Sequence, residues 1–189
     1  MLPNPLHPAV VHFPIVLMFL LPISALIAAW AIRRGSSARN TWAVPVGIAA
    51  ALTLSAWASL QTGQEAGEAV ETRVPEQIVE GHEEGAELFL ALSGVVFVVT
   101  AAGLAGGAAA KVMRPAAVVA SAALVFAGYR VGHSGGELVY KHGAASAIAQ
   151  GGSSGADRPS ATSAAPSAAG PRGERESSER EAAESRRER

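Results

Sequence analysis

Long uncharged, apolar segments alternate with short charged segments along most of the chain. No Asp, Glu, Lys or Arg occurs within 13–32, 40–64, 88–110 or 115–129. The hydrocarbon core of a bilayer is about 30 Å thick, and about 20 consecutive apolar residues in a helix cross it. The pattern therefore predicts four membrane-spanning helices, at about residues 9–32, 42–60, 86–106 and 115–132.

Residues at the ends of these segments predict where the helices stop. Arg33, Arg34 and Gly35 end the first, and Trp42 is expected to anchor the second at the membrane–water interface. The glycine-rich stretch 132–136 is expected to break the last helix, which would let a flat ligand or another backbone approach closely. The glutamates between the second and third segments are expected to form a solvated loop.

The C-terminal part of the chain has a different composition. Residues 151–189 carry seven acidic and seven basic side chains among Gly, Ser, Ala and Pro, with almost nothing apolar to bury. We therefore expect an all-α, integral membrane four-helix bundle over residues 1–146 and a disordered polar tail over 147–189.

The charges between the apolar segments predict the orientation. The segments 33–40 and 107–114 contain only basic residues, +3 and +2, whereas 61–87 contains eight glutamates and one arginine. Because cytoplasmic loops are rich in Lys and Arg, both basic loops are expected in the cytoplasm. Both termini and the glutamate-rich segment would then lie outside the cytoplasm.

Composition excludes several classes of function. Apolar residues make up 49% and charged residues 16% of the chain, against about 25% charged in a soluble domain. A net charge of -1 with no basic domain argues against nucleic-acid binding. Cysteine is absent, which excludes disulfides, iron–sulfur clusters and covalent c-type haem. No phosphate-binding loop, nucleophile elbow or HExxH motif occurs, so we do not expect an enzyme that acts by itself.

The five histidines are the candidate chemistry. With the expected topology all of them lie at the outer face; they are His7, His12, His82, His133 and His142. Helix bundles hold haem or metal between facing helices, and the first and third helices of an up-down bundle are diagonal. His7 and His12 are five residues apart, about 140° around a helix, so both cannot face one site unless Pro8 ends the helix between them. His12 is preferred, with His7 at the rim.

The leading hypothesis is electron transfer by b-type haem. His12 and His82 would be the axial ligands, with His7 or His142 as the substitute, and Arg130 would pair with a propionate. A quinone or a periplasmic carrier would be the electron partner.

Two alternatives stay open. The first is a zinc or copper site built from His12, His82, His142 and Glu83. The second is a structural or assembly subunit without a cofactor, in which the histidines are amphipathic anchors. The oligomeric state is not determined by the sequence.

The two halves of the apolar region share a plan. Each has a histidine where it enters the membrane, a basic turn and a glycine-containing exit. The aligned identity is too slight to establish an internal repeat.

Three motifs resemble a known bacterial family of small membrane proteins, called domain of unknown function twenty-two thirty-one. They are His7-Pro8-Ala9-Val10-Val11-His12-Phe13-Pro14, then Thr62-Gly63-Gln64-Glu65-Ala66 leading to His82-Glu83-Glu84, and Gly135-Gly136-Glu137-Leu138-Val139-Tyr140-Lys141-His142-Gly143. The resemblance covers about residues 5–145, and Ala144-Ala145 replaces the usual Gly-Val.

This resemblance implies a four-helix domain in the bacterial inner membrane, and its pattern carries over onto His7, His12, His82 and His142. His133 lies where members vary more. Some members are joined to Rieske or cytochrome c modules, which implies work beside electron-transfer chains. Any such partner is expected here to be a separate protein.

Overall fold

The computed structural model describes residues 6–70 and 74–143, and this part of the chain consists almost entirely of helices. A short α1, His7–Val10, leads into α2, His12–Arg33, and α3 follows at Ala38–Val70. The chain continues with α4, Glu76–Ala102, and α5, Gly107–Tyr140. The predicted tail over 147–189 lies outside the described residues.

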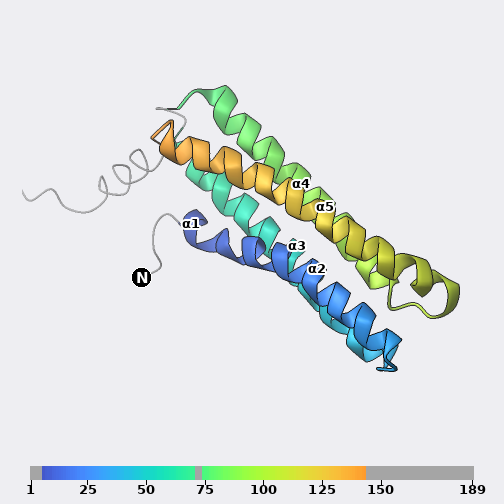
Figure 1. The fold of residues 1–189 in the computed structure, drawn as a ribbon. Helices are drawn as coiled ribbons and strands as arrows, with labels where there is room; N and C mark the ends of the chain where they lie inside the picture. The colour runs from blue at the N-terminus through green and yellow to red at the C-terminus, as the bar shows by residue number, and fades with distance from the viewer. Residues whose placement is uncertain (1–5, 71–73, 144–189) are drawn as a thin grey trace, which may run out of the picture. The chain divides into compact units, whose positions relative to one another are not determined.

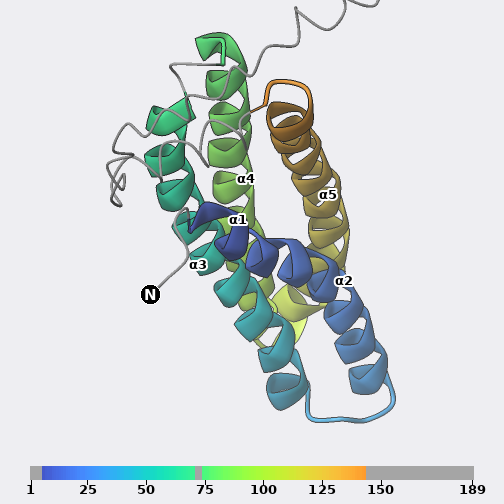
Figure 2. The ribbon, with the colours of Figure 1, turned by 90° about the vertical axis from the view of Figure 1, so that its left-hand side faces the viewer.

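The long helices form an antiparallel four-helix bundle (Figures 1 and 2). Helix α2 packs against α3 and α5, and α4 packs against the same two neighbours. Within the described residues α2 and α4 make no helix contact, and neither do α3 and α5, so these pairs are diagonal. Four helical stretches are long and apolar enough to cross a membrane: His7–Arg33, Ala38–Gly67, Glu76–Ala102 and Gly107–Tyr140. The predicted all-α, four-helix membrane fold is confirmed.

The helices extend beyond their predicted apolar cores at the end of the bundle where the histidines lie. Helix α3 continues past Leu60 into the glutamate-rich segment, and α4 begins at Glu76, so the expected solvated loop is largely helical. The expected break at 132–136 is wrong, because α5 runs through it to Tyr140. A helical glycine costs only about 1 kcal/mol relative to alanine, a cost that packing easily offsets.

At the opposite end the predicted stop is confirmed. Helix α2 ends at Arg33, and Gly35 follows with a φ of 101°, a conformation that glycine adopts without strain. We call this end, with the loops after α2 and α4, the arginine end. The other end, which carries α1, the last turns of α3 and α5 and the first turns of α4, is called the histidine end.

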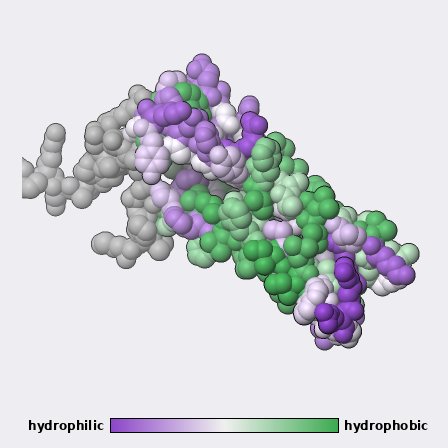
Figure 3. Space-filling view, viewed as in Figure 1, coloured by the Kyte–Doolittle hydropathy of each residue, from purple (hydrophilic) through white to green (hydrophobic). Residues whose placement is uncertain are grey.

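Polarity is arranged as a bilayer requires. On the face seen in Figure 3, apolar residues cover most of the middle of the bundle, and polar residues gather toward both ends. Large apolar side chains point outward, and Phe19, Leu54, Val98 and Phe126 are all exposed. Small residues fill much of the interior, and the buried ones include Ala25, Ala28, Ala49, Ala56, Ser93, Thr100, Ala117 and Ser121. Small interior residues allow helices to approach closely where lipid supplies no hydrophobic driving force.

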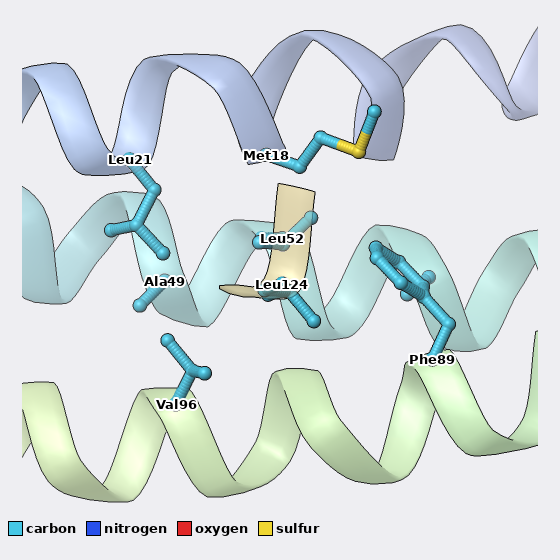
Figure 4. Close-up of a cluster of buried hydrophobic side chains, with 8 residues drawn as sticks. Met18, Leu21, Ala49, Leu52, Phe89, Val96 and Leu124 are labelled. Carbon is cyan, nitrogen blue, oxygen red and sulfur yellow. The ribbon is translucent and has the colours of Figure 1, made fainter. Parts of the chain in front are cut away.

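A cluster of larger side chains fills the middle of the bundle. Met18 and Leu21 of α2 meet Leu52, Phe89, Val96 and Leu124 from the other three helices (Figure 4). Gly128 completes this layer, because a Cβ there would collide with the Met18 sulfur. The cluster therefore joins all four helices between the two polar ends.

At the arginine end the buried Trp42 side chain packs against α4 and α5. Trp42 is 0% exposed, its Nε1–H donates to the Thr100 carbonyl at 2.9 Å, and its ring lies against Gly103. The Arg114 guanidinium lies 5.6 Å from the Trp42 ring centroid, and its Nε donates to the Gly103 carbonyl at 3.0 Å. The expectation of an interfacial anchor at Trp42 is wrong, because the side chain turns inward and links α3 to α4 and α5.

Candidate functional site

The five histidines differ in how far they enter the bundle. His7 and His82 are half-buried, and their rings pack on neighbouring helices. His12, the first residue of α2, is exposed, and so is His133 on α5. His142 is half-buried just beyond α5.

His7 reaches across to α3. Its Nδ1 lies 2.9 Å from the Ser59 carbonyl and 3.3 Å from the Thr62 hydroxyl. The Thr62 hydroxyl itself donates to carbonyls one turn earlier. A carbonyl can only accept, so Nδ1 carries the proton, and in a neutral imidazole Nε2 then keeps its lone pair.

Gly63 makes this approach possible. A Cβ at that position would lie 3.0 Å from His7 Cε1 and 3.2 Å from Nδ1, closer than ordinary side-chain contacts. The imidazole therefore rests directly on the backbone of α3. A glycine in a helix here serves close approach rather than helix termination.

His82 repeats the arrangement on α5. Its Nδ1 lies 2.9 Å from the Ser134 hydroxyl, and that hydroxyl donates to the Val131 carbonyl at 3.0 Å. With its own proton engaged, the Ser134 oxygen accepts from Nδ1–H, which again leaves Nε2 with its lone pair. Gly135 receives the ring, since a Cβ there would lie 3.0 Å from His82 Cε1.

The two imidazoles belong to one region. Both lie at the histidine end and come from diagonal parts of the bundle, His7 ahead of α2 and His82 on α4. Neither Nε2 has a hydrogen-bond partner among the described residues. Ser59, beside the carbonyl that holds His7, is buried, and its hydroxyl also lacks a partner in the described part of the chain. The histidine end thus offers two ligating nitrogens and one unsatisfied hydroxyl.

The remaining predicted residues have other surroundings. Arg130 is exposed, and His133 lies beside Tyr129, with ring centroids 6.1 Å apart. Glu83 accepts a hydrogen bond of 2.6 Å from Gln64, which links α4 to α3. Within residues 6–70 and 74–143, no group of three or more His, Asp or Glu side chains could hold a metal ion. The set His12, His82, His142 and Glu83 is therefore not brought together there.

His7 and His12 have different surroundings. The turn at Val11 separates α1 from α2, and His7 contacts α3, whereas His12 is exposed. The sequence reasoning did not identify Ser59, Thr62 or Ser134 as partners of the imidazoles. A usable signal was present, because a hydroxyl residue followed by glycine occurs both at Thr62-Gly63 and at Ser134-Gly135.

Comparison with known proteins gives one match. The sequence model of the family described as "predicted membrane protein (DUF2231)" matches residues 3–147, most of the chain and all four long helices. No curated protein and no solved structure matches the chain.

Proposed function

We propose that this chain, which belongs to the DUF2231 family of predicted membrane proteins, binds b-type haem between His7 and His82 and carries electrons at one face of the membrane. One observation carries the proposal. Two imidazoles from different helices each have Nδ1 engaged by the protein and Nε2 free among the described residues.

The donor chemistry fits haem iron. Axial histidines bind iron through one ring nitrogen, and the other typically donates to a carbonyl or another acceptor that sets the tautomer and ring orientation. His7 uses a helix carbonyl for this purpose, and His82 uses a hydroxyl that a helix carbonyl itself orients. When bound, haem would supply one-electron chemistry, and the protein would supply the ligands and their orientation.

The surroundings supply further expected roles. Arg130 immediately precedes Val131, whose carbonyl orients the Ser134 hydroxyl, and Arg130 is the expected partner of a propionate. The charge distribution favours the bacterial inner membrane with both termini outside the cytoplasm. A quinone or a periplasmic carrier is then the expected electron partner.

The test is the visible spectrum of the full-length protein, purified after expression with excess haem. We expect a Soret band and a low-spin bis-imidazole spectrum, and loss of both in His7→Ala and in His82→Ala. His12→Ala and His133→Ala are matched controls, since both side chains are exposed, and they should retain haem. Absence of a Soret band in the wild-type protein would refute the proposal, and haem loss confined to His12→Ala would restore His12 as the ligand.

The same preparation tests the alternatives. Elemental analysis that finds stoichiometric zinc or copper, lost in His82→Ala, would replace haem with a metal ion. A protein free of haem and metal that retains a bound partner would point to the structural or assembly subunit.

A further inference from the structure

The buried positions of α2 recur in the α4 segment at a constant interval. Five residues of α2 are buried, and each has a buried counterpart 75 residues later. The pairs are Pro14 with Phe89, Met18 with Ser93, Leu21 with Val96, Ala25 with Thr100, and Ala28 with Gly103. The residue types differ at every pair, which is why sequence identity did not reveal the relation.

Helices α3 and α5 match in part at an interval of 72. Buried Pro45, Ala49 and Leu52 correspond to buried Ala117, Ser121 and Leu124. The other buried residues of α3 have half-buried counterparts in α5; the pairs are Trp42 with Arg114, Ala56 with Gly128, and Ser59 with Val131. The change of interval falls between the two helices of each hairpin, where a difference in connection length is readily tolerated. The bundle therefore consists of two hairpins with a similar pattern of burial.

The two imidazoles and the residues that they contact follow the same intervals of 75 and 72 residues. His82 lies 75 residues after His7, and the hydroxyl and the glycine that each ring contacts recur at an interval of 72. His7 Nδ1 in addition bonds the Ser59 carbonyl at 2.9 Å. Ser59, Thr62 and Gly63 correspond to Val131, Ser134 and Gly135. In each hairpin a hydroxyl donates to the carbonyl three residues earlier, contacts Nδ1, and precedes the glycine on which the ring rests.

Topology relates the two hairpins by rotation. Corresponding helices are diagonal partners, α2 with α4 and α3 with α5, and both hairpins run in the same direction along the bundle (Figure 1). A two-fold axis along the bundle exchanges them. An axis of this kind is the one expected for parallel repeats in a membrane.

We propose that His7-Thr62-Gly63 and His82-Ser134-Gly135 are two equivalent half-sites that bind one ligand on this axis, a metal centre with two opposite positions open to imidazole. The identity of that centre as haem rests on the proposed function; the equivalence of the half-sites does not. Thr62 and Ser134 are positioning residues, because they act on the ligand only through the ring that each orients.

The first experiment needs no haem. Nitrogen-labelled histidine NMR of the full-length protein should show both His7 and His82 protonated at Nδ1. Gly63→Ala should change only the His7 signals and Gly135→Ala only those of His82, since each Cβ would meet one ring. Gly47→Ala and Gly136→Ala are matched controls on the same helices, with nothing within 4 Å of the added Cβ. Either ring protonated at Nε2, or an effect in only one half, would overturn the equivalence.

The second experiment adds haem to the same variants. Because groups that orient a ligating histidine are typically worth 10- to 100-fold in affinity, Ser134→Ala should weaken haem binding by about that factor. Thr62→Ala should weaken it by less, since His7 Nδ1 keeps its 2.9 Å hydrogen bond to the Ser59 carbonyl. Thr62→Ser and Ser134→Thr should bind haem as the wild-type protein does. Unchanged haem binding in Thr62→Ala would refute the positioning role of Thr62 and with it the symmetric site. If the two histidines behave equivalently by NMR but the protein binds no haem, the equivalence of the half-sites is supported and the proposed haem binding is refuted.

Discussion

At both ends of the bundle a flat aromatic ring packs on a helix glycine, but the two contacts serve different purposes. At the arginine end the Trp42 ring lies on Gly103 and donates to the Thr100 carbonyl three residues earlier. At the histidine end the His7 ring lies on Gly63 and contacts the Ser59 carbonyl four residues earlier. In both places a glycine admits a flat ring to a helix backbone, and a ring N–H is satisfied by that helix.

The two ends differ in whether the ring has a second nitrogen that can bind another group. An indole has one N–H and no acceptor, so a buried Trp42 with its bond to Thr100 is complete, and Arg114 covers its face. An imidazole has a second nitrogen, and His7 and His82 are only half-buried. At the arginine end Trp42 thus forms a complete structural contact, which we call the lock. At the histidine end the Nε2 atoms of His7 and His82 have no hydrogen-bond partner among the described residues.

The largest expected effect is removal of the lock. Trp42→Ala should lower the free energy of unfolding by about 3–5 kcal/mol, the usual cost of deleting a buried large aromatic side chain. Trp57→Ala is the matched control on α3, since Trp57 is 56% exposed and faces outward. Denaturant titration in detergent micelles measures both. Equal losses would contradict the assignment of Trp42 as the lock.

The glycines beneath the rings should respond unequally. Gly103→Ala forces a Cβ against a fully buried indole and should destabilise the bundle by about 1–3 kcal/mol. Gly63→Ala should cost less than about 1 kcal/mol, because a half-buried imidazole can move aside and alanine favours the helix. Similar values at both positions would show that the histidine end is as rigidly packed as the lock.

The hydroxyls at the histidine end should matter more for ligand binding than for folding. Thr62→Ala and Ser134→Ala each remove a half-buried hydroxyl that donates within its own helix and contacts one imidazole. The free energy of unfolding should therefore fall by only about 0.5–1.5 kcal/mol. The same micelle titration, run without ligand, measures this. A loss above that range would indicate a structural lock at both ends.

The smallest effect is expected from the exposed histidines. His12→Ala and His133→Ala should change the free energy of unfolding by less than about 0.5 kcal/mol, since neither ring is buried. A substantial loss for His12→Ala would show that His12 has an interior role that its exposure does not reveal.

Much of the fold was predictable from the linear pattern of residues. The four apolar segments and the stop at Arg33 follow from hydropathy and charge along the chain, and the structure confirms them. The glycines of 132–136 misled prediction because a glycine that ends a helix and one that admits His82 have the same local signature. Trp42 misled it similarly, since an interfacial and a buried tryptophan occupy the same place in a sequence.

The amino-acid sequence alone was sufficient for a four-helix membrane protein with histidines gathered toward one end, because crossing a bilayer depends on length and polarity within each segment. The contact of His7 with α3, the hydroxyl beside each Nδ1 and the diagonal pairing of the helices emerged only from the packed bundle. These features depend on the rotation of each helix about its axis and on which helix lies opposite. Contacts between residues more than 50 positions apart set both, and no local pattern contains them.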